Sequence, residues 1–158
     1  MSEDFKFPPF EEYARIGEID KNNFNKLIEA SGYFPKFNAN DTYWDMAFFV
    51  ADQDGNKKIR FNEYEILKTA VQRMLHVEVK YRFQYFIFAL LDSDSSGEIV
   101  SKEIKRLVEY WGISGDDDTC KAYIAYLDSN GDGKIEFVEF LKVWKIYLDL
   151  DYNYSLNK

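Results

Sequence analysis

The sequence predicts an all-α fold in which one helix–loop–helix unit is repeated. A polar segment of twelve residues, rich in Asp and Asn, starts at residues 52, 92 and 128, so it recurs after 40 and 36 residues. A period of this size marks an array of one supersecondary unit. Apolar residues follow the helical period on both sides of each segment. With 158 residues, 46% of them hydrophobic, the chain can bury a core in one domain or two small lobes.

The last of these segments, residues 128–139, matches the pattern D-x-[DN]-x-[DN]-G-x₅-E at every position. Ca²⁺ is a hard cation that takes roughly six to eight oxygen ligands. The pattern offers side-chain oxygens at positions 1, 3 and 5, a backbone carbonyl at position 7 and a bidentate carboxylate at position 12. Gly133 at position 6 permits the sharp turn, because glycine takes positive φ without a steric cost. The predicted ligands are Asp128, Asn130, Asp132, Lys134 through its carbonyl, and Glu139, with Glu136 acting through water.

The two upstream segments carry the same pattern with departures. In residues 92–103, position 5 is Ser96, a weaker oxygen donor than a carboxylate. In residues 52–63, Lys57 stands at position 6, where glycine is expected. The predicted ligands of the first of these loops are Asp92, Asp94, Ser96, Glu98 through its carbonyl, and Glu103. Those of the second are Asp52, Asp54, Asn56, Lys58 through its carbonyl, and Glu63.

These departures predict unequal sites. Loop 128–139 offers the most carboxylates, whereas Lys57 must adopt a left-handed conformation that costs about 1–2 kcal/mol. We therefore expect Ca²⁺ affinity to decrease from loop 128–139 to loop 92–103 and then to loop 52–63. We expect the weakest loop to hold Mg²⁺ or no ion under resting conditions. The alternative for each loop is an Asx-rich turn that binds no metal.

Three such loops resemble those of the EF-hand superfamily of calcium-binding proteins, and the chain is similar to calmodulin-like proteins with four hands. The resemblance covers residues 41–148 more closely than residues 1–40. It implies two or three bound Ca²⁺ ions, with Mg²⁺ as a competitor, and a target protein or peptide helix as partner. It also implies two lobes of paired EF-hands, with a short antiparallel β-bridge between paired loops.

Loop 52–63 needs an upstream partner, because one helix–loop–helix unit cannot bury its apolar face alone. We identify the partner loop in residues 12–23, where two positions match: Gly17 at position 6 and Ile19 at position 8. Three ligand positions carry residues that do not suit Ca²⁺: Ala14, Ile16 and Asn23. The loop is therefore expected to bind no Ca²⁺. Pro8 and Pro9 prevent an ordinary helix from leading into it. Residues 10–31 are thus interpreted as a degenerate first hand kept for its packing.

The apolar pattern predicts helices at residues 41–50, 61–75, 79–91, 101–111, 116–127 and 137–148, with a tail at 149–158 that frays. Pairing gives an N-terminal lobe, 1–75, with hands at about 10–31 and 41–75. It also gives a C-terminal lobe, 78–158, with hands at about 79–112 and 116–148. The residues at position 8 should meet in the bridges, Ile19 with Ile59 and Ile99 with Ile135.

The charge and the ends of the sequence bear on partners and location. The net charge of −8 argues against nucleic acid and acidic membranes as electrostatic partners. No apolar run reaches the length of a membrane span, the start lacks a secretory signal, and Ser2 replaces the glycine that myristoylation requires. Cys120 is the single cysteine and can form no internal disulfide. We therefore expect a cytoplasmic protein without a membrane anchor.

The remaining conspicuous residues suggest no enzyme. His76 lacks an apparent activated partner and is interpreted as a hinge or surface residue, and Cys120 as a packed thiol rather than a redox group. Asp116–Asp118 are expected to cap a helix rather than to bind metal. The tryptophans suit target grooves and core packing equally well: Trp44, Trp111 and Trp144. The sequence contains no Gly-rich phosphate loop, nucleophile elbow or metalloprotease motif.

Three functions remain open: a sensor that opens on binding Ca²⁺ and grips a target helix, a buffer of the sarcoplasmic type, and a Ca²⁺-responsive subunit of a fixed regulatory assembly. Calmodulin-type promiscuity uses flexible Met-rich grooves, but this chain has three methionines and 18% aromatic residues. The unequal sites favour a sensor, because a weak site titrates during a signal. The aromatic, Met-poor composition also resembles that of buffers whose lobes pack together.

The segment Phe5–Phe10 carries three aromatic residues ahead of the degenerate hand. Its prolines hold it extended, and exposed aromatic rings would forgo roughly 25 cal/mol for each Å² of apolar surface. We therefore expect it to pack onto the N-terminal lobe in place of the missing helix; the alternative is a disordered tail.

Overall fold

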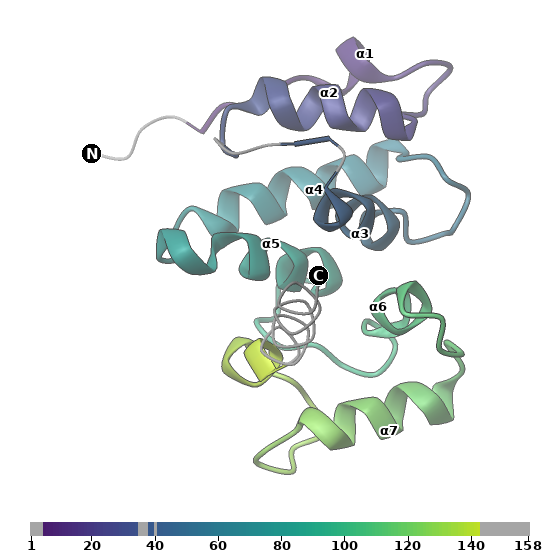
Figure 1. Cartoon of the computed structure of the whole chain (residues 1–158), viewed down its shortest axis with the longest axis vertical. Helices are drawn as coiled ribbons and strands as arrows, with labels where there is room; N and C mark the ends of the chain where they lie inside the picture. The colour runs from purple at the N-terminus through teal and green to yellow at the C-terminus, as the bar shows by residue number, and fades with distance from the viewer. Residues whose placement is uncertain (1–4, 35–37, 40, 143–158) are drawn as a thin grey trace, which may run out of the picture.

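A computed structural model describes residues 5–34, 38–39 and 41–142 of the chain (Figure 1). Its helices are α1 (Phe10–Tyr13), α2 (Lys21–Ser31), α3 (Thr42–Ala51), α4 (Phe61–Met74), the 3₁₀ helix η1 (Val79–Tyr81), α5 (Arg82–Leu91), α6 (Lys105–Tyr110) and α7 (Asp117–Leu127). A further helix begins at Phe137 and is described as far as Lys142. The all-α prediction is confirmed. The rest of the predicted helix at 137–148, with Trp144, and the tail at 149–158 lie outside the described residues.

Two predicted helices begin later than the sequence pattern indicated. The helix expected at 101–111 is α6, which starts at Lys105, after a turn formed by residues 101–103. The helix expected at 79–91 opens with the 3₁₀ turn η1 before α5 begins at Arg82. Neither helix start has a side-chain cap, so no local signal sets the first residue. None of the described helices combines the length and apolarity needed to cross a bilayer.

The loops meet in two isolated antiparallel bridges, as predicted. Ile19 pairs with Ile59 through N···O distances of 2.8 and 2.7 Å, and Ile99 pairs with Ile135 through distances of 2.8 and 2.9 Å. All four isoleucine side chains are completely buried. Each bridge therefore satisfies backbone polar groups while its side chains join the core. The bridges establish that the first hand pairs with the second and the third with the fourth.

The first loop, residues 12–23, is closed by a local backbone bridge between two of its own residues. Arg15 and Glu18 form a local bridge, and the intervening Ile16 and Gly17 have positive φ values of 54° and 76°. The side chain of Ile16 points into solvent. The Asn23 side-chain amide, at the position of the usual carboxylate, donates to the Tyr13 carbonyl at 3.0 Å.

The N-terminal segment packs onto the first lobe, as predicted. Phe5 stacks on Tyr33 with ring centroids 5.4 Å apart, and Phe7 lies 5.9 Å from the ring of Tyr64. Phe10 is buried against the same tyrosine, whose hydroxyl donates to the Pro8 carbonyl at 2.6 Å. The aromatic rings and the short helix α1 therefore take the place of a full helix leading into the first loop.

The two lobes are docked against each other in a continuous core. In Figure 1, α1 to α4 form the upper half, α6 and α7 form the lower half, and α5 lies between them against α4. Aromatic side chains line the junction, where Trp44 of α3 contacts Phe83 of α5, and Phe34 contacts both Trp44 and Phe86. The lobes are thus joined through packed side chains as well as through the chain connection.

Polar contacts across the junction also satisfy helix ends. Arg106 of α6 donates to the Phe49 carbonyl near the end of α3, from Nη2 at 3.0 Å, and its guanidinium lies 3.8 Å from the centre of the Phe49 ring. The Gln53 side chain donates to the Leu90 carbonyl near the end of α5 at 3.3 Å. Because the last carbonyls of a helix lack partners within it, these side chains stabilise the docked arrangement.

Replacing Phe10 by Ala should test the role of the N-terminal segment. Phe10 is 8% exposed, so its loss should reduce the free energy of unfolding by about 3 kcal/mol. The neighbouring exposed variant Glu12→Ala is the control and should change stability by less than about 0.5 kcal/mol. Chemical denaturation measures both. Equal stability of the two variants would contradict a packing role for the segment.

Candidate metal sites

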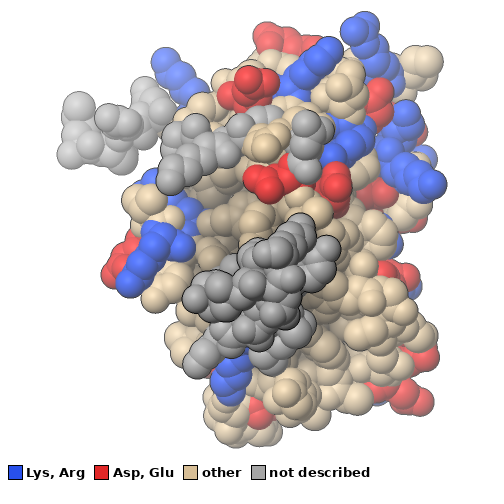
Figure 2. All heavy atoms as spheres, in the orientation of Figure 1, with Lys and Arg blue, Asp and Glu red and all other residues tan. Residues whose placement is uncertain are grey.

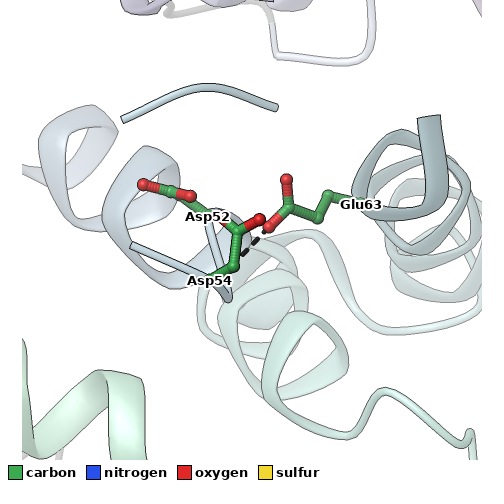
Figure 3. Close-up of side chains that lie close together, drawn as sticks. All are labelled: Asp52, Asp54 and Glu63. Atoms are coloured by element: carbon green, nitrogen blue, oxygen red, sulfur yellow. Dashed lines mark hydrogen bonds between the residues drawn. The ribbon is translucent and has the colours of Figure 1, made fainter. Parts of the chain in front are cut away.

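Loop 52–63 gathers three carboxylates, two from the flanking helix ends and one from within the loop. Asp52 follows α3 directly, and Glu63 lies in the first turn of α4. Oxygens of Asp52, Asp54 and Glu63 lie within 4.8 Å of one another (Figure 3). Glu63 accepts hydrogen bonds from the Arg60 amide at 2.9 Å and the Asp54 amide at 3.3 Å. The carboxylate at position 12 is therefore tied to both halves of its loop.

Lys57 adopts the left-handed conformation that the sequence predicted, with φ of 66°. Its backbone N–H donates to Oδ2 of Asp52 at 2.7 Å. The loop therefore closes in spite of the missing glycine. The hydrogen bond to Asp52 offsets part of the strain of a side chain at positive φ.

Loop 92–103 gathers Asp92, Asp94 and Glu103 in the same way, within 4.8 Å. Asp92 is fully buried and accepts the amides of Ser96 at 3.0 Å and Gly97 at 2.8 Å. The hydroxyl of Ser96 lies 3.1 Å from Oδ1 of Asp92, so the weak donor at position 5 faces the position-1 carboxylate. Glu103 accepts the Val100 amide at 3.1 Å.

Loop 128–139 has the same backbone closure but a different carboxylate group. Asp128 accepts the Gly133 amide at 2.7 Å, and Glu139 accepts the amides of Glu136 at 3.0 Å and Ser129 at 2.6 Å. The described carboxylates that lie within 4.8 Å here are Glu98, Asp132 and Glu136. The structure thus does not gather Asp128, Asp132 and Glu139 as it gathers the carboxylates of the other two loops, and the predicted order of affinities stays a prediction.

The sequence did not predict that the side chains of Glu98 and Glu136 lie close together. It assigned only the backbone carbonyl of Glu98 as a ligand and expected Glu136 to coordinate the ion through water. The bridge between Ile99 and Ile135 is the signal that could have found them. In an antiparallel register the residues flanking a pair also face each other, which sets Glu98 opposite Glu136. The paired loops therefore share acidic side chains across the bridge.

The three loops share a local design at positions 5 and 7. The amide at position 7 donates to the side chain at position 5 in every case: Lys58 to Asn56 at 3.0 Å, Glu98 to Ser96 at 3.2 Å, and Lys134 to Asp132 at 3.0 Å. In loop 128–139 the Asp132 amide donates in turn to Asn130 Oδ1 at 3.3 Å. These bonds hold the polar side chains on the inner side of each turn.

Burial affects the protonation of the gathered carboxylates. Desolvation raises the pKa values of Asp52, Glu63 and Glu103 above their ordinary range, because a poorly hydrated site disfavours the charged form. A divalent cation bound by these oxygens would favour that charged form. The donors are carboxylate, amide, hydroxyl and carbonyl oxygens, which suit Ca²⁺ or Mg²⁺ better than they suit a softer metal. The residues therefore fit the ion that the loop pattern predicts.

A family model for an EF-hand domain pair matches residues 80–145. Calcium-dependent protein kinase 3 of Plasmodium berghei is 32% identical over 135 residues, which are 82% of this chain and 23% of the kinase. A protein of Oryza sativa subsp. japonica named "Probable calcium-binding protein CML13" is 26% identical over 131 residues, which are 82% of this chain and 72% of that protein. The chain belongs to the EF-hand superfamily of calcium-binding proteins.

Further similarity is to parts of larger proteins. Calcium-dependent protein kinase 22 of Arabidopsis thaliana is 36% identical over 92 residues, which are 58% of this chain and 17% of the kinase. This EF-hand chain therefore spans less than a quarter of the length of the kinases that it matches.

Other residues singled out by the sequence have structural surroundings. Asp116 accepts the Thr119 amide at 2.7 Å and caps α7, as the capping interpretation predicted. Cys120 is buried, and burial raises the pKa of its thiol, which is the setting of a packed side chain. His76 is exposed in the turn after α4. Trp44 is buried at the lobe junction, and Trp111 packs against Tyr123.

Replacing Lys57 by Gly should strengthen Ca²⁺ binding at loop 52–63 by about tenfold, because it removes about 1–2 kcal/mol of left-handed strain and one positive charge. Lys57→Met is the matched control, since it removes the charge but keeps the strain. Calorimetric titration of both variants measures the difference. Equal affinities in the two variants would contradict the strain argument.

Replacing Glu139 by Gln should weaken Ca²⁺ binding at loop 128–139 by about tenfold or more, which is at least about 1.4 kcal/mol, and should also lower affinity at loop 92–103. The second effect follows from the shared Ile99–Ile135 bridge. The exposed helix variant Glu29→Gln is the control. Site-resolved titration by NMR checks both loops, and an unchanged loop 92–103 would disprove the coupling.

Proposed function

We propose that this EF-hand chain is a calcium sensor, in which ion binding changes the arrangement of the lobes and a target protein or peptide helix reads that change. The observation that carries the proposal is the contact between α4 and α5. Glu63 lies in the first turn of α4, and α5 ends directly before Asp92. A shift of either helix on ion binding must therefore change the position of the other, since packed helices do not deform continuously.

The names of the relatives agree with a regulatory role, because two of them are calcium-dependent protein kinases that match over this EF-hand region. The partner of a sensor of this kind would be a protein segment in the same polypeptide or in another. The function proposed for these residues is binding and not catalysis. We propose two or three Ca²⁺ ions, competition by Mg²⁺, and a cytoplasmic location.

The surface supports a protein partner over nucleic acid. Figure 2 shows Lys and Arg side chains interspersed with Asp and Glu on the half of this face that contains α1 to α4. The net charge is −8. Nucleic-acid binding depends on a basic surface that releases counterions, so this charge pattern disfavours it.

A buffer is the second candidate, and the lobe junction is the observation that favours it. Aromatic contacts such as Trp44 with Phe83 hold the lobes together, and a buffer changes little on binding Ca²⁺. A responsive subunit of a fixed assembly would share the sensor's conformational change but keep its partner without Ca²⁺.

Fluorescence of a hydrophobic dye with and without Ca²⁺ separates these functions. For a sensor we expect Ca²⁺ to increase dye fluorescence severalfold, because helix movement exposes apolar surface, and chelation to reverse the change. The control is the triple variant Glu63→Gln, Glu103→Gln and Glu139→Gln, which should give no increase. A wild-type protein that binds Ca²⁺ by calorimetry without any change in dye binding would be a buffer. Retention of a target in chelator would indicate a fixed subunit.

A further inference from the structure

An arginine of the N-terminal lobe reaches into the third calcium loop. Arg73 lies near the end of α4, and its Nη2 is 2.8 Å from Oδ2 of Asp92, the position-1 ligand of loop 92–103. Its Nη1 donates to the Asp92 carbonyl at 3.3 Å and lies 3.5 Å from the Ser95 hydroxyl. The side chains of Arg73 and Asp92 are 18% and 0% exposed. The pair is therefore sheltered, unlike a surface ion pair.

The guanidinium of Arg73 also contacts Tyr85 of α5. Tyr85 accepts a hydrogen bond from Arg73 Nη2 at 3.4 Å, and the Arg73 Cζ lies 5.6 Å from the centre of its ring. The arginine thus has contacts on the loop and on the helix that leads into the loop. Its position depends on α4 and α5 remaining packed together.

This contact distinguishes loop 92–103 from the other two. Asp52 and Asp128 also stand at position 1, and each accepts the amide of its position-6 residue, Lys57 or Gly133, at 2.7 Å. Among the described residues, however, no side-chain cation lies within 4.0 Å of either carboxylate. The arginine is therefore an addition to the common loop design and not a part of it.

We propose that Arg73 lowers the calcium affinity of loop 92–103 by sharing Asp92 with the ion, and so makes that affinity depend on the docking of the two lobes. The inference rests on the proposed function only in that the loop binds Ca²⁺. A guanidinium on one carboxylate oxygen repels a divalent cation approaching the other, and little water is present to screen the repulsion. By linkage, bound Ca²⁺ weakens the hold of Arg73 on Asp92 to the same extent.

The consequence is a coupling between the lobes. Arg73 comes from the second hand and Asp92 from the third, so separation of α4 from α5 withdraws the arginine and strengthens calcium binding at the loop. Equally, a partner that binds the separated lobes would raise the Ca²⁺ affinity of this loop without contacting its ligand residues. The ion pair is thus the element through which lobe docking and the third site influence each other.

The first test compares Arg73→Met with Arg82→Met in the full chain. Arg82 also lies at the lobe connection, but it donates to the carbonyls of Val77 and Leu75 and not to a ligand. The backbone amide of Gly97, which donates to Asp92 at 2.8 Å, reports occupancy of this loop by NMR during a Ca²⁺ titration. We expect Arg73→Met to raise the affinity read at Gly97 by about threefold to tenfold, and Arg82→Met to leave it unchanged.

An unchanged or weakened affinity at Gly97 in Arg73→Met would overturn the inference. Should that variant fail to fold by circular dichroism, Arg73→Gln is the second variant, because it removes the charge and retains hydrogen bonding. If Gly97 does not respond to Ca²⁺ even in the wild type, the metal assignment of the loop fails, and the inference fails with it. A wild-type response combined with equal affinity in all variants would overturn the role of Arg73 alone.

A double-mutant cycle tests the link to docking. Phe83 lies in the first turn of α5 and contacts Tyr43 and Trp44 of α3, whereas Asp92 follows the other end of that helix. Phe83→Ala should loosen the junction and raise the affinity at Gly97 when Arg73 is present, but not in the Arg73→Met background. The same increase in both backgrounds, or no increase in either, would show that docking does not act through the arginine.

Discussion

Two carboxylates, one at each end of a twelve-residue loop, hold the helices of each calcium hand in place. Asp52 and Asp92 directly follow the entering helices, Glu63 lies in the first turn of α4, and Glu103 lies in the turn just before α6. These groups accept backbone amides of their own loops, so the loop is shaped before an ion arrives. The same burial that orders the carboxylates makes their charge costly without a counterion. Calcium binding and helix position are therefore connected through the same side chains.

Pairing of the loops through backbone bridges connects the two hands of each lobe. The bridges between Ile19 and Ile59 and between Ile99 and Ile135 join loops that could not bury their apolar faces alone. In the first pair, one loop has lost its ligands but keeps the isoleucine that pairs, and the segment around Phe10 covers the side where a longer helix is missing. The first loop thus keeps its packing role although its sequence lacks the usual ligand residues.

Docking of the lobes joins two pairs of hands through a continuous core. Helices α4 and α5 lie together, and side chains from each lobe satisfy helix-terminal carbonyls or ligands of the other, as Arg106 does at Phe49 and Arg73 does at Asp92. Such contacts have two discrete states, made or broken, and packed interfaces respond in this bistable manner. The aromatic junction and these polar contacts therefore join the calcium loops of the two lobes into one packed unit.

The sequence by itself determined the features that depend on local pattern: the all-α class, the grouped carboxylates of loops 52–63 and 92–103, the left-handed Lys57, the isoleucine bridges and the packing of the aromatic N-terminal segment. Each of these follows from residue spacing along one segment or from a pairing rule, and those are readable without coordinates. Only the tertiary structure decided the late start of α6, the meeting of Glu98 with Asp132 and Glu136, and the contact of Arg73 with Asp92. The reason is physical: these features depend on how helices and loops far apart in sequence are oriented, and that orientation is set by the fit of many side chains together.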